Sequence, residues 1–591
     1  MRRIRRRVGA RGAARPRAAR TTTAVLSLRD LAVSFPGGVQ ALRGVSLEVA
    51  PGEIVGLVGE SGAGKTVLGL AALGLLPPSA ELDGHAFLGD TDMATAPDEQ
   101  RRVARKRFAG AVFQDPMTSL NPTMTVGRQV AEATGSMAAA IEALQRARVP
   151  DADRRARQYP HELSGGLRQR VMIAMAVAGA PALIVADEPT TALDVTVQAE
   201  ILRSLSDLRD ETGSSMLFVT HDFAVAASLA DRVAVLYGGR LAEVGPTTEL
   251  LQQPDHPYTA GLLAARPTPD SPRGRPLPFL PGEPPDPRAH VDACPFAPRC
   301  ALVTPACEER LPKVTAAPSH AGLVACLRAG EPPPSRLQVQ DRFPDQGQML
   351  GRPPALRLDE LTKAFGSGQH LAVGGLTLEV PAGGAVALVG ESGCGKTTTL
   401  RMAVGLERPD SGTVEVGEGG RPQLVFQDAG ASLTPWLSVG ELLEERLRCE
   451  GFTAPERAGR VRDVLALVGL PISVLGLRAR QLSGGQRQRV AIARAIAVPP
   501  ALLACDEPVS ALDVSLAAVV LNLLCRLRAE LGMALLFVTH DLAVARFVGD
   551  HVAVMHAGQI IEEGPPETVL ERPQHPQTKA LVAAIPRLEG A

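Results

Sequence analysis

The chain has 591 residues, several times the usual length of one domain, so we expect two or more domains. Hydrophobic residues make up 45% and charged residues 21%, which is typical of a folded globular protein and too apolar for a disordered one. The formal net charge of −1, from 62 basic and 63 acidic residues, excludes a surface built throughout to hold nucleic acid.

The first segment, residues 1–24, is rich in arginine, and we expect it to be a disordered tail. Nine of its first twenty residues are Arg, and no apolar segment follows, so the pattern is not that of a secretory signal. Without an export signal, the eight cysteines are expected in a reducing cytosol, where structural disulfides are rare. No stretch reaches the roughly 18–20 apolar residues that a bilayer span requires, so any membrane role would come through a partner.

Residues 25–264 have the pattern of an α/β domain with a mainly parallel sheet. Apolar runs at 54–58, 182–186 and 216–219 are typical of strands buried on both faces. The first run leads into the sequence GESGAGKT, which opens a helix, as a phosphate-binding loop requires. Backbone N–H groups of such a loop bind phosphate oxygens, its lysine reaches the β- and γ-phosphates, and its threonine binds Mg²⁺. The residues expected in these roles are Gly59, Ser61, Gly62, Gly64, Lys65 and Thr66.

Polar residues follow the next two predicted strands of this domain. Asp187 and Glu188 come directly after the run 182–186, and His221 comes after the run 216–219. The first carboxylate can hold Mg²⁺, and the second can accept a proton from an attacking water. Taken alone, Asp-Glu after a strand is more often a capped helix start, but beside a phosphate loop the catalytic interpretation is favoured. We expect the histidine to contact the γ-phosphate.

Residues 265–330 form an extension with four closely spaced cysteines, and residues 331–354 form a Pro-rich linker. Residues 265–355 hold 20 of the 49 prolines, which excludes long helices and central strands there. Cys294, Cys300, Cys307 and Cys326 are half of all the cysteines. Such a group suits an iron–sulfur cluster or Zn²⁺, although the C-x₂-C pairs of zinc ribbons are missing, and free thiols are the third alternative.

Residues 355–591 repeat the first domain, so the chain contains a tandem duplication. The sequence LSGG occurs at 163–166 and again at 482–485, an offset of 319 residues. The aspartate after the strand and the histidine recur at the same offset, whereas the loop lysines are 331 residues apart. The second set of loop residues is Gly390, Ser392, Gly393, Gly395, Lys396 and Thr397. The residues matching the first carboxylates and histidine are Asp506, Glu507 and His540.

These motifs resemble the nucleotide-binding subunits of ATP-binding cassette (ABC) transporters, and the resemblance covers nearly the whole chain from Leu26. The sequence LSGG discriminates this family from other P-loop ATPases. The resemblance implies two P-loop domains, each with a helical subdomain, that form a head-to-tail sandwich. Each ATP would lie between the phosphate loop of one half and the signature of the other. The further residues implied are the signature residues Ser164, Gly165, Gly166, Ser483, Gly484 and Gly485; Gln114 and Gln427, near Mg²⁺ and the membrane subunit; Phe35 and Phe365, stacking on adenine; and the D-loop residues Asp194 and Asp513.

The extension resembles that of oligopeptide/dipeptide-type importers, a group that includes nickel and glutathione importers and in which the cysteines can hold a [4Fe–4S] cluster. The sequence HPYT at 256–259 and the cysteine motif carry this likeness, and HPQT at 575–578 repeats its first part. The resemblance implies ATP and Mg²⁺ as ligands. It implies two integral membrane permease subunits and an extracytoplasmic substrate-binding protein as partners, and a place on the cytoplasmic face of the plasma membrane. The sequence does not select the substrate.

Two other classes of ABC ATPase share the duplicated architecture. Translation-associated members join their cassettes by a long charged helix, which the Pro-rich segment could not form. DNA-repair members carry large zinc-bearing insertions inside the cassettes, and none is visible. We therefore expect an importer ATPase with two active sites, and no nucleic acid partner.

Overall fold

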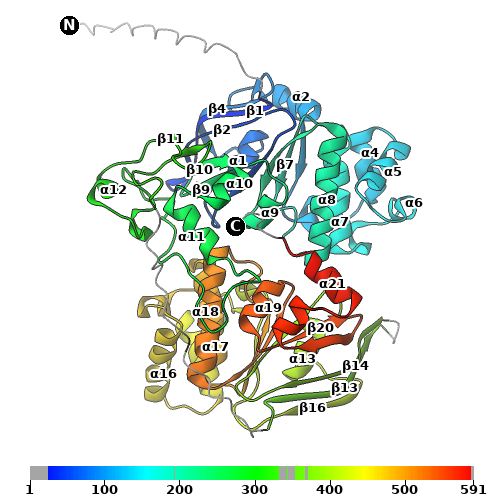
Figure 1. Cartoon of the computed structure of the whole chain (residues 1–591), viewed down its shortest axis with the longest axis vertical. Helices are drawn as coiled ribbons and strands as arrows, with labels where there is room; N and C mark the ends of the chain where they lie inside the picture. Colours follow the sequence, from blue (N-terminus) through cyan, green and yellow to red (C-terminus); the bar gives the residue numbers. More distant parts are fainter. Residues whose placement is uncertain (1–23, 192, 332–342, 344–352, 367–369, 587–591) are drawn as a thin grey trace, which may run out of the picture.

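The computed structural model describes residues 24–191, 193–331, 343, 353–366 and 370–586. Residues 1–23 of the predicted tail, and nearly all of the predicted linker at 331–354, lie outside the described residues. Two lobes of similar architecture lie one above the other in Figure 1, the first coloured blue to green and the second yellow to red.

The first lobe is built on a sheet in the order β11-β12-β10-β9-β3-β8-β7-β6. The strands β6, β7, β8, β3 and β9 pair in parallel, whereas β10 and the short strands of the extension pair antiparallel. The core strands are buried on both faces, as predicted: Ile54 and Val58 join the hydrophobic core on one side, Val55 and Leu57 the core on the other. The strands of this sheet are β3 (Ile54–Val58), β6 (Ala109–Val112), β7 (Leu183–Asp187), β8 (Ser215–Val219), β9 (Arg232–Tyr237), β10 (Arg240–Pro246), β11 (Thr315–Ala316) and β12 (Leu323–Val324).

A second, antiparallel sheet in the order β2-β1-β4-β5 covers one side of this core. Strands β2 and β4 alternate more buried and more exposed side chains over part of their length, which explains why the sheet packs on one face only. The strands are β1 (Leu26–Phe35), β2 (Val39–Val49), β4 (Glu81–Leu88) and β5 (Thr91–Asp92).

Helices pack on both faces of the first sheet, and α4, α5 and α7 contact one another in a helical subdomain at the right of Figure 1. The helices of this half are α1 (Lys65–Ala72), α2 (Asp98–Phe108), α3 (Pro116–Ser119), α4 (Val126–Thr134), α5 (Met137–Arg146), α6 (Ala152–Arg155), α7 (Gly165–Val177), α8 (Val195–Thr212), α9 (Phe223–Ala227), α10 (Thr247–Gln252) and α11 (Pro257–Ala265). Within the described ranges, every helix is too short or too polar to cross a membrane.

The second lobe repeats this plan with a sheet in the order β17-β18-β19-β15-β20-β21 and a smaller sheet in the order β14-β13-β16. Its strands are β13 (Leu356–Phe365), β14 (His370–Val380), β15 (Ala385–Gly390), β16 (Ser411–Val416), β17 (Gln423–Val425), β18 (Leu502–Asp506), β19 (Ala534–Thr539), β20 (His551–His556) and β21 (Gln559–Gly564). Its helices are α13 (Lys396–Ala403), α14 (Ala429–Ser432), α15 (Val439–Cys449), α16 (Ala454–Leu467), α17 (Gly484–Ile496), α18 (Val514–Leu531), α19 (Leu542–Val548), α20 (Pro566–Glu571) and α21 (Pro576–Ala583).

The unequal offsets between the two copies have a structural cause. The first copy carries β5 and α2 between its phosphate loop and Gln114, whereas the described chain of the second copy passes from β16 directly to β17. The helical subdomain differs in the opposite sense, since the second copy has the longer helices α15 and α16 there. The duplicated α/β fold expected from the sequence is thus confirmed, and the insertions fall between the motifs.

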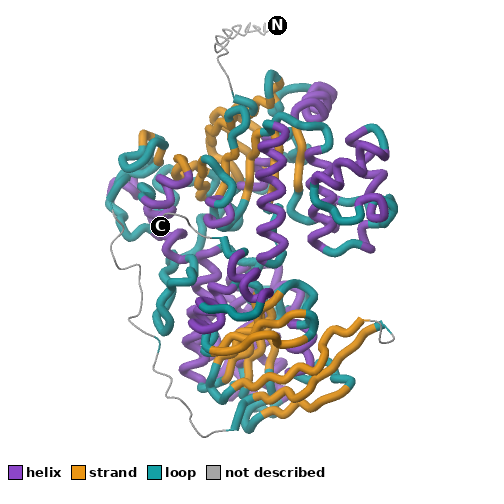
Figure 2. The backbone as a smooth tube through the Cα atoms, turned by 45° about the vertical axis from the view of Figure 1, so that its right-hand side comes forward, coloured by secondary structure: helices purple, strands orange, loops and turns teal. Residues whose placement is uncertain are grey.

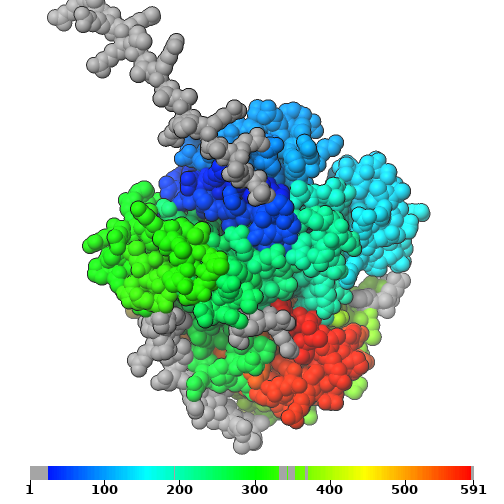
Figure 3. Space-filling view, turned by 45° about the horizontal axis from the view of Figure 1, so that its top comes forward, coloured from blue at the N-terminus to red at the C-terminus, as the bar shows by residue number. Residues whose placement is uncertain are grey.

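The extension forms a lobe beside the first half, coloured green in Figure 3. Its described part contains only short elements, among them α12 (Pro305–Glu309), as expected from its proline content, and Figure 2 draws most of it as loop. Its strand β12 pairs with β10, so the extension continues the sheet of the first half.

A buried polar cluster fastens the extension to that sheet. His320 Nε2 lies 2.9 Å from Glu243 Oε1 and 3.7 Å from Asp255 Oδ2, and all three side chains are fully buried. Asp255 also accepts hydrogen bonds from the backbone and hydroxyl of Ser319. Glu243 also accepts from the backbone N–H groups of Asp255 and His256, and in the second half Glu562 accepts the equivalent bonds from Gln574 and His575.

We predict that His320→Ala loosens the extension, because it leaves two buried carboxylates without their imidazole partner, at a cost of about 3–5 kcal/mol. Limited proteolysis should then cut within residues 265–331 at a much higher rate, while the rest of the chain stays resistant. His290→Ala, which removes an exposed histidine of the same extension, should leave the rate unchanged. Equal rates for both variants would contradict the role assigned to the cluster.

Candidate active site

Both phosphate-binding loops connect a buried strand to a helix whose first residue is the lysine: β3 to α1, and β15 to α13. Gly64 and Gly395 precede these lysines with φ of 103° and 108°, in the region that favours glycine. A Cβ at either position would lie 2.6 Å or 2.2 Å from a backbone carbonyl oxygen, that of Ala41 or Ala372. Only glycine fits there. Because glycine has no side chain, the loop can follow this tight path and its backbone N–H groups stay accessible to a ligand.

The two lysines are held inside their loops. Lys65 Nζ donates to the carbonyl oxygens of Gly59 (2.7 Å) and Glu60 (3.1 Å), and Lys396 Nζ donates to those of Gly390 (2.8 Å) and Glu391 (2.7 Å). Burial lowers the pKa of Lys65, against the opposite influence of the surrounding carboxylates. A polyphosphate would offset this burial, since it brings negative charge to the ammonium.

A hydroxyl and a carboxylate meet beside each loop. Thr397 Oγ1 donates to Asp506 Oδ1 over 3.2 Å. In the first half Thr66 interacts with the Asp187 carboxylate, and burial raises the pKa of both aspartates. The Oδ1 atom of Asp187 is buried without a hydrogen-bond partner. Such oxygen donors fit a Mg²⁺ ion and its bound water.

Glu188 and Glu507 stand at the ends of β7 and β18 with the same partners in both halves. Glu188 Oε2 accepts from Gln114 Nε2 (3.2 Å) and lies 3.4 Å from His221 Nδ1. Glu507 Oε2 accepts from Gln427 Nε2 (3.2 Å) and lies 3.1 Å from His540 Nδ1.

The backbone and the charge of these glutamates are both unusual. Their φ values of 47° and 44° are strained for a residue with a side chain. Burial opposes ionisation of Glu188, but the hydrogen bond and charge of His221 outweigh it and lower the pKa of Glu188 to about 2. Burial likewise opposes the charge of His221, and Glu188 raises its pKa. The carboxylate is therefore ionised at neutral pH, as a base for an attacking water must be.

The halves meet through aspartates that begin long helices. Asp194 caps α8, and its Oδ2 atom accepts from Ser392 N of the second loop over 3.2 Å. Asp513 caps α18, and its Oδ2 atom accepts from Ser61 N of the first loop over 3.4 Å. Each loop is therefore touched by the other half, which is the head-to-tail arrangement that the family resemblance implies.

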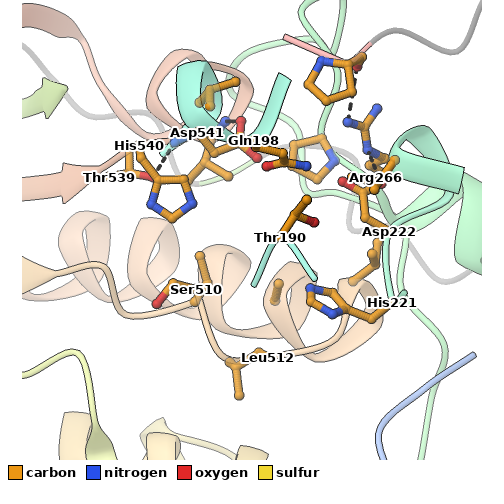
Figure 4. Close-up of a pocket in the computed structure, with 18 of the residues that line it drawn as sticks. Thr190, Gln198, His221, Asp222, Arg266, Ser510, Leu512, Thr539, His540 and Asp541 are labelled. Carbon is orange, nitrogen blue, oxygen red and sulfur yellow. Dashed lines mark hydrogen bonds and ion pairs between the residues drawn. The ribbon is translucent and has the colours of Figure 1, made fainter. Parts of the chain in front are cut away.

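A cavity of about 160 Å³ lies between the halves and is lined from both sides. In Figure 4, His221 and His540 stand on opposite sides of it, with Thr190 between them. Helix α11 of the first half packs on α18, and α21 of the second half packs on α8. His221 of the first half and Glu507 and His540 of the second thus line one shared space.

The remaining predicted site residues lie at the ends of elements. Ser164 and Ser483 cap α7 and α17 and accept from the N–H groups of Leu167 and Gln486, with the signature glycines in the first turn of each helix. Phe35 and Phe365 end β1 and β13, where the latter is 43% exposed.

The four clustered cysteines converge on one small cavity, with Arg328 and Leu302 beside them. Burial raises the pKa of Cys326 to about 11 and raises that of Cys294 and Cys300 as well. Metal ions and iron–sulfur clusters bind the thiolate form, so a bound group would have to lower these pKa values. Within the described residues, the side chains close enough together to hold a single ion are Glu243, Asp255 and His320, not these cysteines. Of the other cysteines, Cys449 is exposed and three are buried.

Two contacts were not predicted from the sequence, one at the first phosphate loop and one beside the second signature. Arg299 forms a buried ion pair with Glu60, and Glu283 accepts a hydrogen bond from Gln486. The only hint was the position of Arg299 inside the cysteine motif, directly before Cys300.

Comparisons with known proteins agree with this geometry. The family model "ABC transporter" matches residues 42–191 and 373–510, and the model "Oligopeptide/dipeptide transporter, C-terminal region" matches residues 242–307 and 561–591. The chain is 41% identical to the oligopeptide transport ATP-binding protein OppD of Mycobacterium tuberculosis, over 96% of this chain and 99% of that protein.

Two further relatives match along nearly the same length. The peptidoglycan transport ATP-binding protein YejF of Agrobacterium fabrum is 38% identical over 96% of this chain and 98% of its own. The glutathione import ATP-binding protein GsiA of Pectobacterium atrosepticum is 38% identical over 95% of this chain and 89% of its own. With two cassettes and the extension in one chain, the protein belongs to the ATP-hydrolysing, ATP-binding subunits of ABC transporters, in the oligopeptide/dipeptide branch of that family.

Proposed function

We propose that this chain energises a membrane importer for peptides of the dipeptide or oligopeptide class. The observation that carries the proposal is the combination of two complete sets of catalytic residues with an extension of the oligopeptide/dipeptide type. The relatives named above, whose names refer to oligopeptide, peptidoglycan and glutathione transport, support it. A ribosomal role has no such support, and we do not retain it.

Two ATP molecules bind between the halves in this proposal. The loop residues of one half hold the phosphates, and the signature helix of the other half presents its N-terminus to them. Asp194 and Asp513 link the two walls, since each contacts the opposite loop. Mg²⁺, held beside Thr66 and Asp187 and beside Thr397 and Asp506, supplies charge stabilisation to the phosphates.

Hydrolysis then depends on positioning. Glu188 and Glu507 accept the proton of the attacking water, which adds in line to the terminal phosphorus while the bond to the ADP oxygen breaks. His221 and His540 hold these carboxylates by the contacts described above, and they lie where a terminal phosphate would be reached. Gln114 and Gln427 touch the same oxygen atoms, so they would sense whether the site is filled.

Exposed apolar side chains beside the two glutamines support a docking surface for two permease subunits. Met117, which follows Gln114 by three residues in the chain, is 57% exposed, and Trp436, which follows Gln427 by nine, is 71% exposed. Large exposed apolar residues of this kind are typical of interfaces. With an extracytoplasmic substrate-binding protein to deliver the peptide, the chain would work at the cytoplasmic face of the plasma membrane.

We further propose a [4Fe–4S] cluster on Cys294, Cys300, Cys307 and Cys326, since these four line one cavity. The domain limits that go with this function are 25–264 and 355–591 for the cassettes and 265–330 for the extension. Residues 1–24 and 331–354 then serve as a tail and a linker.

Partner capture tests the importer proposal most directly. We predict that the tagged chain, purified from detergent-solubilised native membranes, brings two integral membrane proteins that mass spectrometry identifies as permeases. Membranes that contain the untagged chain are the control. Ribosomal proteins without a permease would contradict the proposal.

Loss of one catalytic base should be visible in ATP turnover. We predict that Glu188→Gln lowers turnover by at least half, and that Glu188→Gln with Glu507→Gln lowers it by about 10²–10⁴-fold, the usual contribution of a general base. Glu211→Gln, on the exposed end of α8, is the matched control and should keep full activity. Full turnover by Glu188→Gln alone would mean that the first site does not hydrolyse ATP.

A further inference from the structure

The first phosphate loop has a contact that reaches it from the extension. Arg299 Nη1 and Nη2 donate to the two carboxylate oxygens of Glu60 over 2.7 Å and 2.9 Å. The side chains are only 4% and 3% exposed. Tyr258 Oη accepts from the backbone N–H of Glu60 over 2.9 Å, so the loop is held at both its side chain and its backbone. A two-pronged, buried pair of this kind fixes geometry as well as charge.

Arg299 is itself held by a segment that continues into the second half. Its Nε atom donates to the carbonyl oxygen of Pro281 over 2.8 Å. Two residues further along, Glu283 Oε1 accepts from Gln486 Nε2 over 2.9 Å. Gln486 directly follows the second signature, which is the other wall of the site that contains the Glu60 loop. Residues 277–299, here called the strap, therefore bridge both walls of the first site.

The strap is also fastened to the long helix of the second half. Leu277 N donates to Asn522 Oδ1, and Asn522 Nδ2 donates back to Leu277 O, each over 2.8 Å. Leu280 N donates to Ser515 Oγ over 3.3 Å. Both partners lie on α18, the helix that Asp513 begins. The strap thus holds the second half in place beside the first loop.

The second site differs at each of these points. Glu391, which matches Glu60, is 36% exposed at its side chain, and the one ion pair of its carboxylate among the described residues is with His556 Nδ1 at 3.8 Å. His556 and Gln577 stand where the first half has tyrosines. The first signature continues with Leu167, which cannot make the hydrogen bond that Gln486 makes.

We propose that the strap makes the two ATP sites unequal, so that the site formed by the first loop and the second signature binds ATP more tightly than the other. Arg299 and Glu283 are positioning residues in this proposal, which rests on the two-site arrangement given under the proposed function. Arg299 neutralises a carboxylate next to the phosphate loop, and the strap keeps the two walls together before the nucleotide arrives. Both effects lower the free energy needed to assemble the site around a polyanion.

Site-resolved labelling tests the inference. The full chain with Glu188→Gln and Glu507→Gln, which retains nucleotide, is titrated with 8-azido-ATP, and mass spectrometry assigns the label to peptides of residues 25–264 or 355–591. We expect half-saturation of the first half at a concentration lower by on the order of tenfold than that of the second. Equal half-saturation of both halves would overturn the inference, whereas absence of label from both would contradict ATP binding itself.

Variants of the strap, made in the chain with Glu188→Gln and Glu507→Gln, test whether the strap causes the difference in ATP affinity between the two sites. Glu283→Ala, which removes the acceptor of the Gln486 hydrogen bond, and Arg299→Gln should weaken labelling of the first half toward that of the second and leave the second unchanged. Arg299→Lys, which keeps the charge without the two-pronged contact, should fall between them. Arg288→Gln, an exposed arginine of the same strap, is the control and should have no effect. If Arg299→Gln does not fold, Glu283→Ala still decides, because the Glu283 side chain is half exposed.

A double-mutant cycle shows whether the hydrogen bond between Glu283 and Gln486 itself strengthens ATP binding at the first site. Gln486→Leu gives the second signature the residue of the first. Glu283 and Gln486 share one hydrogen bond, while Gln486 also accepts from Ser483 N and Glu283 also pairs with Arg489. The double variant should therefore lose less affinity at the first site than the sum of the two single losses. Losses that add would overturn the assignment of this contact to the strap.

Discussion

Reciprocal contacts between the halves are the constraint on which the two sites depend. Asp194 of the first half reaches Ser392 of the second loop, and Asp513 reaches Ser61 of the first. Each aspartate also caps the long helix that it begins, so the position of that helix and the completion of the opposite loop are fixed together. A change at one site is therefore transmitted to the backbone of the other half, which is what coupled closure around two nucleotides requires.

Duplication of the cassette did not produce equal surroundings for the two sites. The catalytic carboxylates, glutamines and histidines are arranged almost identically, with Glu188 and Glu507 in the same strained backbone conformation. The differences lie in the residues around these side chains, where the extension of the first half contacts the first loop through Arg299 and Glu60. Joining both halves in one chain allows such a difference, because the extension between them has a fixed place relative to both.

Much of the fold could be predicted because its signals are local. The runs at 54–58 and 385–389 are apolar throughout, and a strand buried on both faces needs no more than that. The loops, the carboxylates and the shared offset of 319 residues are short-range patterns, so the site residues could be proposed from them. The inserted helix α2 and the short helical segments of the first half were visible only as a change of offset.

Contacts between distant segments could not be predicted. Glu60 and Arg299 are separated by 239 residues, and Glu283 and Gln486 by 203. Each is an ordinary charged or polar residue in the sequence, and nothing local indicates that Glu60 would be buried. The pairing arises from the path of the extension over the surface, which depends on the buried His320 cluster and on the backbone hydrogen bonds to α18.

Counting bound ATP in paired variants tests most directly that each site is shared between the halves. Lys65→Ala with Ser483→Arg places both changes in one shared site, whereas Lys65→Ala with Ser164→Arg places one change in each. Equilibrium binding of ATP should give one molecule per chain for the first pair and none for the second. The opposite result, one molecule retained only when both changes lie in the same half, would mean that each half binds ATP on its own and would contradict the arrangement described here.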